Sequence, residues 1–271
     1  MIFSEQSNLE SILNELFRTY FERVPDVKKI TNAIIKKGWV SSKEDIINDH
    51  IAFRTLGADN LGIASFEKIF LQHGYVKKEF YSFKAKKLDA YWYAPPTNNL
   101  PRIFISELRV NDLSDKAQQI VRKYTDSIKS DPVDSMDMNK SSEVIEFFEK
   151  PLWKLPTLED YNDLLNESEY AAWVIYNRYY LNHYTISVHE LPNGYDRLEN
   201  FNAFLSELDI KLNDAGGVIK TSKDGLLLQS SSVAEMITAT FAGNKTQKIA
   251  GSYVEFAERK VLAEFQDLDP S

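Results

Sequence analysis

The stretch NDHIAFRTLG, residues 48–57, predicts a β-strand that ends at a glycine turn. Successive side chains of a strand point to opposite faces of a sheet, so His50 and Arg54 share one face. Ile51 and Phe53 share the other face, where they can cover an apolar core. A strand face that carries an imidazole and a guanidinium must meet water, a partner charge or a functional site.

The composition limits the chemistry that this chain can carry. Its 271 residues include no cysteine, which excludes disulfides and thiolate catalysis, so any metal ion must be bound by His, Asp or Glu. The formal net charge is -8 at pH 7. Because the sequence also lacks a cluster of Lys and Arg, we expect it to bind neither nucleic acid nor an anionic membrane surface.

The sequence shows no sign of secretion or membrane insertion. Its first residues, MIFSEQSNLES, lack a basic segment followed by a long apolar run, which argues against a signal peptide. No stretch approaches the roughly 20 apolar residues of a transmembrane helix. We therefore expect a cytoplasmic protein whose partners are small molecules, and the sequence does not predict its oligomeric state.

The order of predicted elements indicates a single α+β domain, built around a repeat, that spans the chain. Residues 1–45 are predicted to form helices, with a break at Pro25. Residues 46–110 read as strand, helix and three strands, and the same order returns in residues 183–271. Residues 111–182, between the two copies, are predicted to form a helical insert.

Both copies carry a histidine on the first strand and a glutamate on the last. His50 and His183 open the two copies, and Glu107 and Glu255 lie on their last predicted strands. This arrangement is typical of the vicinal-oxygen-chelate architecture. In that architecture two βαβββ modules pair to form a cupped mixed sheet with a metal ion at its centre, and we expect this fold here.

Two imidazoles and one carboxylate form the ligand set of many iron(II) oxygenases, and this set leaves neighbouring coordination positions open. His50, His183 and Glu255 match the set, with Glu107 as the alternative carboxylate. A 2-oxo acid can chelate the metal at two open positions, and O2 can then bind beside it. The competing interpretation makes the histidines structural and leaves each glutamate facing solvent or in an ion pair.

Other polar residues each allow two interpretations. Arg54 is predicted either to bind the far carboxylate of a dicarboxylic substrate bidentately or to pair with an acidic residue such as Asp49 or Glu258. His73 lies at a predicted helix end and His189 at a predicted strand end. We expect both of these histidines to be peripheral to the site.

Three further residues are candidate substrate contacts. Gln229 and Ser231 share a face of the polar strand LLLQSSSVAEM, and Tyr253 shares a face with Glu255. Ordinary packing is the alternative for all three, because polar strand ends and sheet tyrosines are common without function. The sequence contains no P-loop, no GxGxxG after a strand, no GxSxG and no HExxH motif.

The segments NDHIAFRT, NHYTISVHEL, LLLQSSSVA and GSYVEFAER resemble the 2-oxoadipate dioxygenase/decarboxylase family, non-haem iron(II) enzymes of vicinal-oxygen-chelate type. The spacing of His50 and Arg54 carries the resemblance most specifically. The resemblance implies iron ligands at His50, His183 and Glu255, and a substrate-carboxylate contact at Arg54. It also implies conversion of 2-oxoadipate and O2 into 2-hydroxyglutarate and CO2, a step of lysine breakdown.

Better-known members of that family are longer, whereas only residues 256–271 follow Glu255 here, so the resemblance leaves the exact 2-oxo acid open. Two other functions fit the same pattern. One is an oxygen-independent lyase, isomerase or hydrolase that uses Zn, Ni or Mn, with Glu107 as a fourth ligand. The other is a non-enzymatic small-molecule binder in which His50 and His183 are structural.

Overall fold

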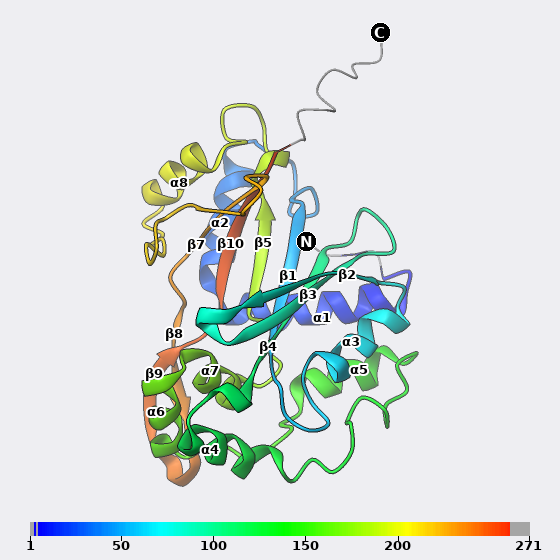
Figure 1. Ribbon diagram of the computed structural model, residues 1–271. Coiled ribbons are helices and arrows are strands. Elements are labelled where there is room, and N and C mark those ends of the chain that lie inside the picture. The colour runs from blue at the N-terminus through cyan, green and yellow to red at the C-terminus, as the bar shows by residue number, and fades with distance from the viewer. Residues whose placement is uncertain (1–2, 4, 261–271) are drawn as a thin grey trace.

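A mixed eight-stranded sheet forms the centre of the computed structural model, which describes residue 3 and residues 5–260 (Figure 1). Its order is β2-β3-β4-β1-β5-β10-β7-β6. The two modules meet where β1 and β5 run antiparallel. The strands are β1 Asn48–Leu56, β2 Val76–Phe83, β3 Leu88–Ala94, β4 Arg102–Leu108, β5 His183–Ser187, β6 Lys220–Thr221, β7 Leu227–Ser231 and β10 Tyr253–Arg259.

Each half of the sheet is built in the same way. The first strand of each module pairs parallel with the last, β1 with β4 and β5 with β10. The third strand then adds antiparallel on the outer side, and the second forms the edge. One helix follows the first strand of each module, α3 Ile63–Gln72 and α8 Leu198–Glu207. The expected α+β pair of βαβββ modules is therefore confirmed.

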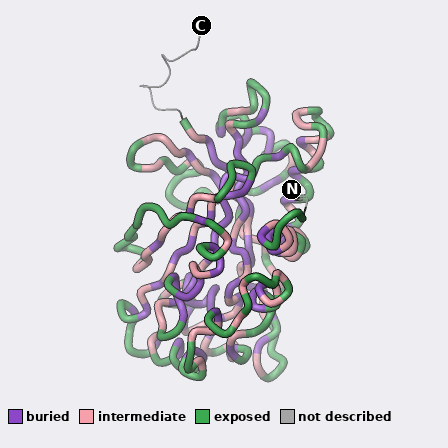
Figure 2. The backbone as a smooth tube through the Cα atoms, turned by 90° about the vertical axis from the view of Figure 1, so that its right-hand side faces the viewer, coloured by how far each residue is buried: buried purple, intermediate pink, exposed green. Residues whose placement is uncertain are grey.

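The apolar face of β1 covers the core, as its alternation predicts. Phe53 is fully buried, and its ring packs against Phe66 of α3 with the ring centroids 4.8 Å apart. Helices α1 Asn8–Arg23 and α2 Pro25–Lys36 also pack on the sheet. Proline begins α2, where the first N–H has no helical partner to lose. Figure 2 shows buried residues along the central strands and exposed ones at the periphery.

The helical insert packs against both modules. Trp173 of its last helix donates its indole N–H to the carbonyl oxygen of Gly251 at 2.8 Å, which ties the insert to the second module. The side chains of this last helix are largely buried, so it is a packed element rather than a loose lid. The helices of the insert are α4 Asp115–Thr125, α5 Ser141–Glu149, α6 Leu158–Glu167 and α7 Glu169–Asn177.

A hairpin that the sequence pattern did not predict lies between β7 and β10. Its strands, β8 Met236–Thr240 and β9 Thr246–Ala250, form a separate two-stranded sheet. The single strand expected over residues 226–236 therefore ends with β7. The hairpin packs on the insert, where the rings of Phe241 and Tyr176 have centroids 5.0 Å apart. Most hairpin side chains are exposed or half-buried, so the apolar alternation that marks a buried strand is weak.

The strand register corrects the expected equivalence of Glu107 and Glu255. The opening histidines of β1 and β5 lie opposite the first residues of β4 and β10. Counted along β4 and β10 from those residues, Glu107 matches Glu258, and Glu255 matches Phe104. Sequence order alone could place each glutamate on a last strand but could not supply this register.

Glu107 and Glu258 share a structural role at the start of each module's helix. The backbone N–H of Ile63 donates to Glu107 at 2.7 Å, and that of Leu198 donates to Glu258 at 2.9 Å. A carboxylate at a helix N-terminus satisfies a free N–H and complements the helix dipole. Gly62 has φ +80 and passes so close that an added Cβ would lie 2.1 Å from a Glu107 oxygen, so only glycine fits there.

Candidate metal centre and substrate cavity

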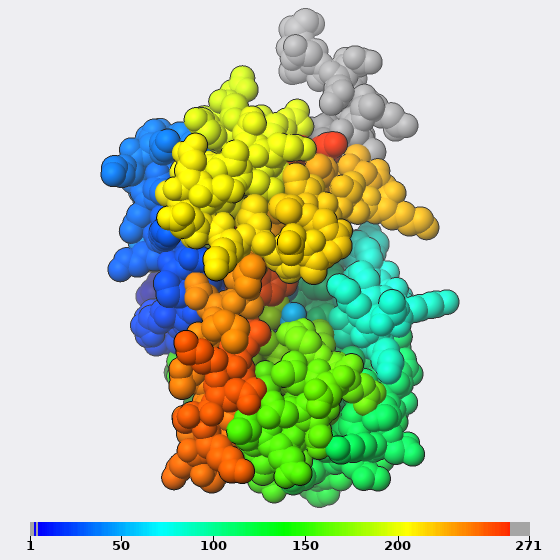
Figure 3. Space-filling model, turned by 90° about the vertical axis from the view of Figure 1, so that its left-hand side faces the viewer, coloured from blue at the N-terminus to red at the C-terminus, as the bar shows by residue number. Residues whose placement is uncertain are grey.

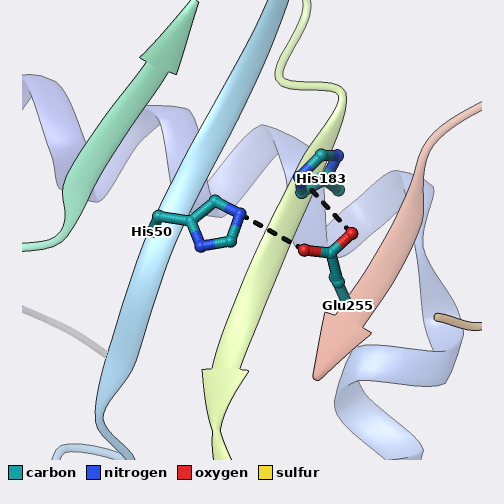
Figure 4. Close-up of side chains that lie close together, drawn as sticks. All are labelled: His50, His183 and Glu255. Atoms are coloured by element: carbon teal, nitrogen blue, oxygen red, sulfur yellow. Dashed lines mark ion pairs between the residues drawn. The ribbon is translucent and has the colours of Figure 1, made fainter. Parts of the chain in front are cut away.

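Three neighbouring strands in the middle of the sheet bring His50, His183 and Glu255 together (Figure 4). The ligand atoms that they offer all lie within 4.8 Å of one another. His50 Nε2 is 3.3 Å from one Glu255 oxygen, and His183 Nε2 is 3.9 Å from the other. Two imidazole nitrogens and one carboxylate thus face a common point, an arrangement that can hold a divalent metal ion.

Each imidazole is oriented by the residue before it in the chain. His50 Nδ1 donates to the Asp49 carboxylate at 2.8 Å, and His183 Nδ1 donates to the Asn182 side-chain oxygen at 3.0 Å. These bonds leave both Nε2 atoms toward Glu255. Metal-binding histidines are generally held in this way through the nitrogen that does not bind the metal. The donor set therefore fits a metal ion, with the two Nε2 atoms as ligands.

The two histidines have opposite pKa shifts. Burial would lower the pKa of His50, but hydrogen bonds to Asp49 and Glu255 raise it to about 9. Burial lowers the pKa of His183 to about 4, because the opposing attraction of Glu255 is too weak to offset it. Burial favours the neutral form of Glu255, yet both histidines hold its pKa below the usual range. Without metal, the centre therefore keeps a proton on His50.

Two of the predicted substrate contacts touch the metal ligands themselves. Gln229 donates its side-chain N–H to Glu255, and the Tyr253 ring stacks on the His183 ring with centroids 4.9 Å apart. Ser231 lies opposite Glu255 in the β7–β10 register and is buried. The structure thus places Gln229 where it orients a carboxylate ligand, whereas Tyr253 borders the open side of the centre.

A cavity of about 480 Å³ opens beside the centre, and His183 and Tyr253 belong to its wall. The opposite wall comes from the helical insert, at the junction of α6 and α7. The β2–β3 turn lines a third side. Figure 3 shows a hollow on this side of the molecule, between the second module, the β2–β3 hairpin and the insert. The insert therefore forms part of the cavity as well as joining the modules.

Arg54 lines the same cavity and has neither of the expected ion-pair partners. Its Nη1 donates to both oxygens of Glu169 on α7, at 3.1 and 3.2 Å. Its guanidinium carbon lies 5.0 Å from the centre of the Tyr170 ring. The two partners named as examples are wrong, because Asp49 binds Arg259 and Glu258 binds Arg197, but the alternative that Arg54 pairs with an acidic residue is borne out by Glu169.

A sequence model of the 2-oxoadipate dioxygenase/decarboxylase family matches residues 12–268. This chain belongs to that family. The chloroplastic/amyloplastic 2-oxoadipate dioxygenase/decarboxylase of Oryza sativa subsp. japonica is 40% identical over 272 residues, which cover 97% of this chain and 72% of the relative.

Solved structures agree with the family assignment. A crystal structure of hydroxyglutarate synthase from Oryza sativa in complex with 2-oxoadipate matches with a TM-score of 0.84 and 40% identity, over 96% of this chain and 83% of the other. A glyoxalase-superfamily protein from Ralstonia eutropha JMP134 matches with a TM-score of 0.71 and 21% identity, over 93% and 83% of the two chains. At that identity the second match supports the fold alone.

Three polar residues singled out in the sequence, Glu107, His73 and His189, lie outside the metal centre. Glu107 accepts a hydrogen bond from the Ile63 N–H at the start of α3. It lies on the opposite sheet face from Phe104 and Ser106, which line the cavity. His73 is the C-cap residue that follows α3, and His189 Nδ1 lies 3.2 Å from the Ala257 carbonyl oxygen. The only group of metal-binding side chains found among the described residues is the one formed by the two strand-opening histidines and the β10 glutamate.

Four residues around the centre were missed by the sequence patterns. Asp49 and Asn182 each precede a candidate ligand, a repeated adjacency that could have been found. Thr185 stands two residues after His183 on the same strand face, and its hydroxyl lies 3.2 Å from His50 Nε2. Glu169 had no local signal, because its contact with Arg54 spans 115 residues. Within the described range, no helix is long and apolar enough to cross a membrane.

Proposed function

We propose that this protein is an iron(II)-dependent dioxygenase that decarboxylates 2-oxoadipate, with 2-hydroxyglutarate and CO2 as products. The observation that carries the proposal is a two-histidine, one-carboxylate cluster that opens onto an arginine-containing cavity, in a member of this family. The atoms balance with O2 as the only co-substrate. The first carbon leaves as CO2, one oxygen atom completes the new carboxylate, and the other becomes the hydroxyl on the adjacent carbon.

His50, His183 and Glu255 would hold the iron. Two neutral imidazoles and one carboxylate leave a bound ion with net positive charge, which favours an anionic 2-oxo acid. When bound, iron(II) supplies a Lewis acid for the 2-oxo acid and the electrons that activate O2. Other divalent ions such as Zn, Ni or Mn fit the same donors, and a purified sample could contain them.

Arg54 is proposed to bind the far carboxylate of the substrate. Arg54 and His50 lie four residues apart on β1, about 13 Å along a strand, a span that the long arginine side chain shortens. A guanidinium binds a carboxylate in a defined orientation, so the contact sets the position of the substrate and selects dicarboxylic acids. Tyr253 and Tyr170 line the cavity together with Arg54 and His183, and we expect their rings to help exclude water.

Oxygen consumption tests the proposal directly. Protein loaded anaerobically with iron(II) is mixed with 2-oxoadipate and O2, then with shorter and longer 2-oxo acids, while O2 uptake and CO2 release are recorded. Equal uptake and release with 2-oxoadipate is the expected result. No uptake by protein shown to hold iron would favour an oxygen-independent metal enzyme. The proposal places the protein in lysine breakdown, and its cytoplasmic location stays a prediction.

A further inference from the structure

Arg54 already binds a carboxylate that belongs to the protein. Both oxygens of Glu169 lie within 3.2 Å of Arg54 Nη1. The two partners differ in their freedom to move, because the Arg54 side chain is 17% exposed and that of Glu169 is 54% exposed. The guanidinium is enclosed by the protein, whereas the carboxylate reaches it from the solvent side.

The surroundings hold Arg54 in place without Glu169. The guanidinium carbon lies 5.0 Å from the centre of the Tyr170 ring and 5.2 Å from that of Trp173, at distances typical of cation–π contacts. Its backbone lies within β1, where it pairs with Ser106 of β4. Loss of the Glu169 contact would therefore leave the arginine side chain in its pocket.

Glu169 has a second favourable position for its charge. It is the first residue of α7, whose N-cap is Ser168. A negative charge in the first turn of a helix interacts favourably with the helix dipole in any exposed rotamer. The carboxylate can therefore turn toward water at little cost, while an unpaired Arg54 in the cavity would be costly.

We infer that Glu169 occupies the place of the substrate's far carboxylate on Arg54 in the empty enzyme, and that a dicarboxylic substrate displaces it. The inference rests on the proposed function. If Glu169 stayed on Arg54, the incoming carboxylate would meet a like charge at the same guanidinium. Displacement removes that repulsion, and Glu169 keeps the buried arginine paired whenever the cavity is empty. Glu169 is thus a residue that determines specificity by competing with the substrate.

The test compares Glu169→Gln with the wild-type enzyme. Binding of 2-oxoadipate to the iron(II)-loaded protein is measured anaerobically by calorimetry, and KM and kcat are measured in air. We expect Kd and KM to fall by about two- to five-fold, the equivalent of one partly exposed ion pair, with kcat unchanged. The six-carbon monocarboxylic acid 2-oxohexanoate should gain nothing, because it has no group to place on Arg54.

Glu167→Gln is the matched control. Glu167 lines the same cavity wall, but its carboxylate binds Ser114 and lies near Lys87 rather than Arg54. The control removes the same charge at nearly the same place, so its effect on 2-oxoadipate binding should be smaller than that of Glu169→Gln. An equal effect of both variants would reduce the role of Glu169 to general electrostatics and overturn the inference.

A structure of the anaerobic complex with 2-oxoadipate gives a readout that does not depend on turnover. The inference requires the Glu169 carboxylate to have left Arg54 in that complex. Glu169 still bound to Arg54, or a raised KM in Glu169→Gln, would show instead that it orients the arginine for the substrate. Wild-type protein that neither binds nor converts 2-oxoadipate would refute the proposed function itself, an outcome separate from these.

Discussion

The two βαβββ modules share one scaffold but contribute unequally to the metal centre. Each opens with a strand histidine, His50 in the first module and His183 in the second. The carboxylate comes from the second module alone, because Glu255 stands where the first module has Phe104. A symmetric pair of modules has thus become an asymmetric site, in which one half of the sheet supplies two ligands and the other supplies one.

Apart from the two histidines, the symmetric polar positions described above hold the fold. Glu107 and Glu258 bind the first turns of α3 and α8 in equivalent ways, and both lie on the last strand of their module. Around the metal centre the histidines are shared, whereas the carboxylate ligand and the residues that orient the histidines differ between the modules. The comparison teaches that the repeat predicts the scaffold glutamates and the paired histidines, whereas the third ligand depends on which module carries the carboxylate.

Replacing Glu255, the carboxylate ligand that the first module lacks, should have the largest effect on metal binding. Glu255→Gln removes the negative charge of the ligand set, so we expect metal affinity to fall by about 100-fold or more and O2 uptake to disappear. Competition titration with a chelator measures the affinity, and metal content after dialysis gives a second value. The control is Glu107→Gln, because the sequence pattern had predicted Glu107 to be the equivalent of Glu255. This variant should bind metal normally. Equal metal binding by both variants would refute the asymmetry.

The residues that orient the two histidines should also differ. Asp49 holds His50 with a charged carboxylate that Arg259 binds at 2.6 and 2.8 Å, whereas Asn182 holds His183 with a neutral amide. Loss of such an orienting group typically weakens metal binding by about 10- to 100-fold. We expect Asp49→Asn to lie near the upper end of that range and Asn182→Ala near the lower end.

Cobalt(II) titration measures both variants, because its visible absorption reports ligand geometry as well as affinity. A shifted absorption spectrum would show that the imidazole ligand has changed its orientation. A spectrum of unchanged shape but lower intensity would show only that less metal-binding protein is present. Because Asp49→Asn keeps an oxygen that can accept from His50, metal binding as tight as in the wild type would show that the charge of Asp49 contributes nothing beyond its hydrogen bond.

The pH dependence of metal binding should come from the first module. The pKa of His50 is raised to about 9, so at neutral pH the metal must displace its proton, whereas His183, with a pKa of about 4, is already neutral. Affinity should therefore rise by about tenfold per pH unit from pH 7 and level off near pH 9. Chelator titrations at several pH values test this slope. A rise in affinity of about 100-fold per pH unit would mean that two protons are displaced, and it would show that His183 is protonated at neutral pH as His50 is.

Local patterns predicted the parts of this protein that local physics determines. Alternation identified the first and last strands of both modules, and the faces of His50, His183 and Glu255 followed from it. Pairing in space was not accessible in the same way. The register that matches Glu107 with Glu258, and the contact of Arg54 with Glu169, depend on how distant segments dock. The β8–β9 hairpin was missed because mostly exposed strands need little apolar alternation.

The smallest effect should come from Glu107 and Glu258, the scaffold glutamates that the modules share. Glu107→Gln and Glu258→Gln each replace a charge that accepts an N–H at a helix start, so each should lower the free energy of unfolding by about 1–2 kcal/mol. Urea unfolding of the metal-free proteins measures this change. Metal affinity should stay within about twofold of wild type, because neither carboxylate belongs to the centre. A loss of metal binding in Glu258→Gln but not in Glu107→Gln would contradict this expectation. It would mean that Glu258 also positions Glu255, which lies on the same strand, β10.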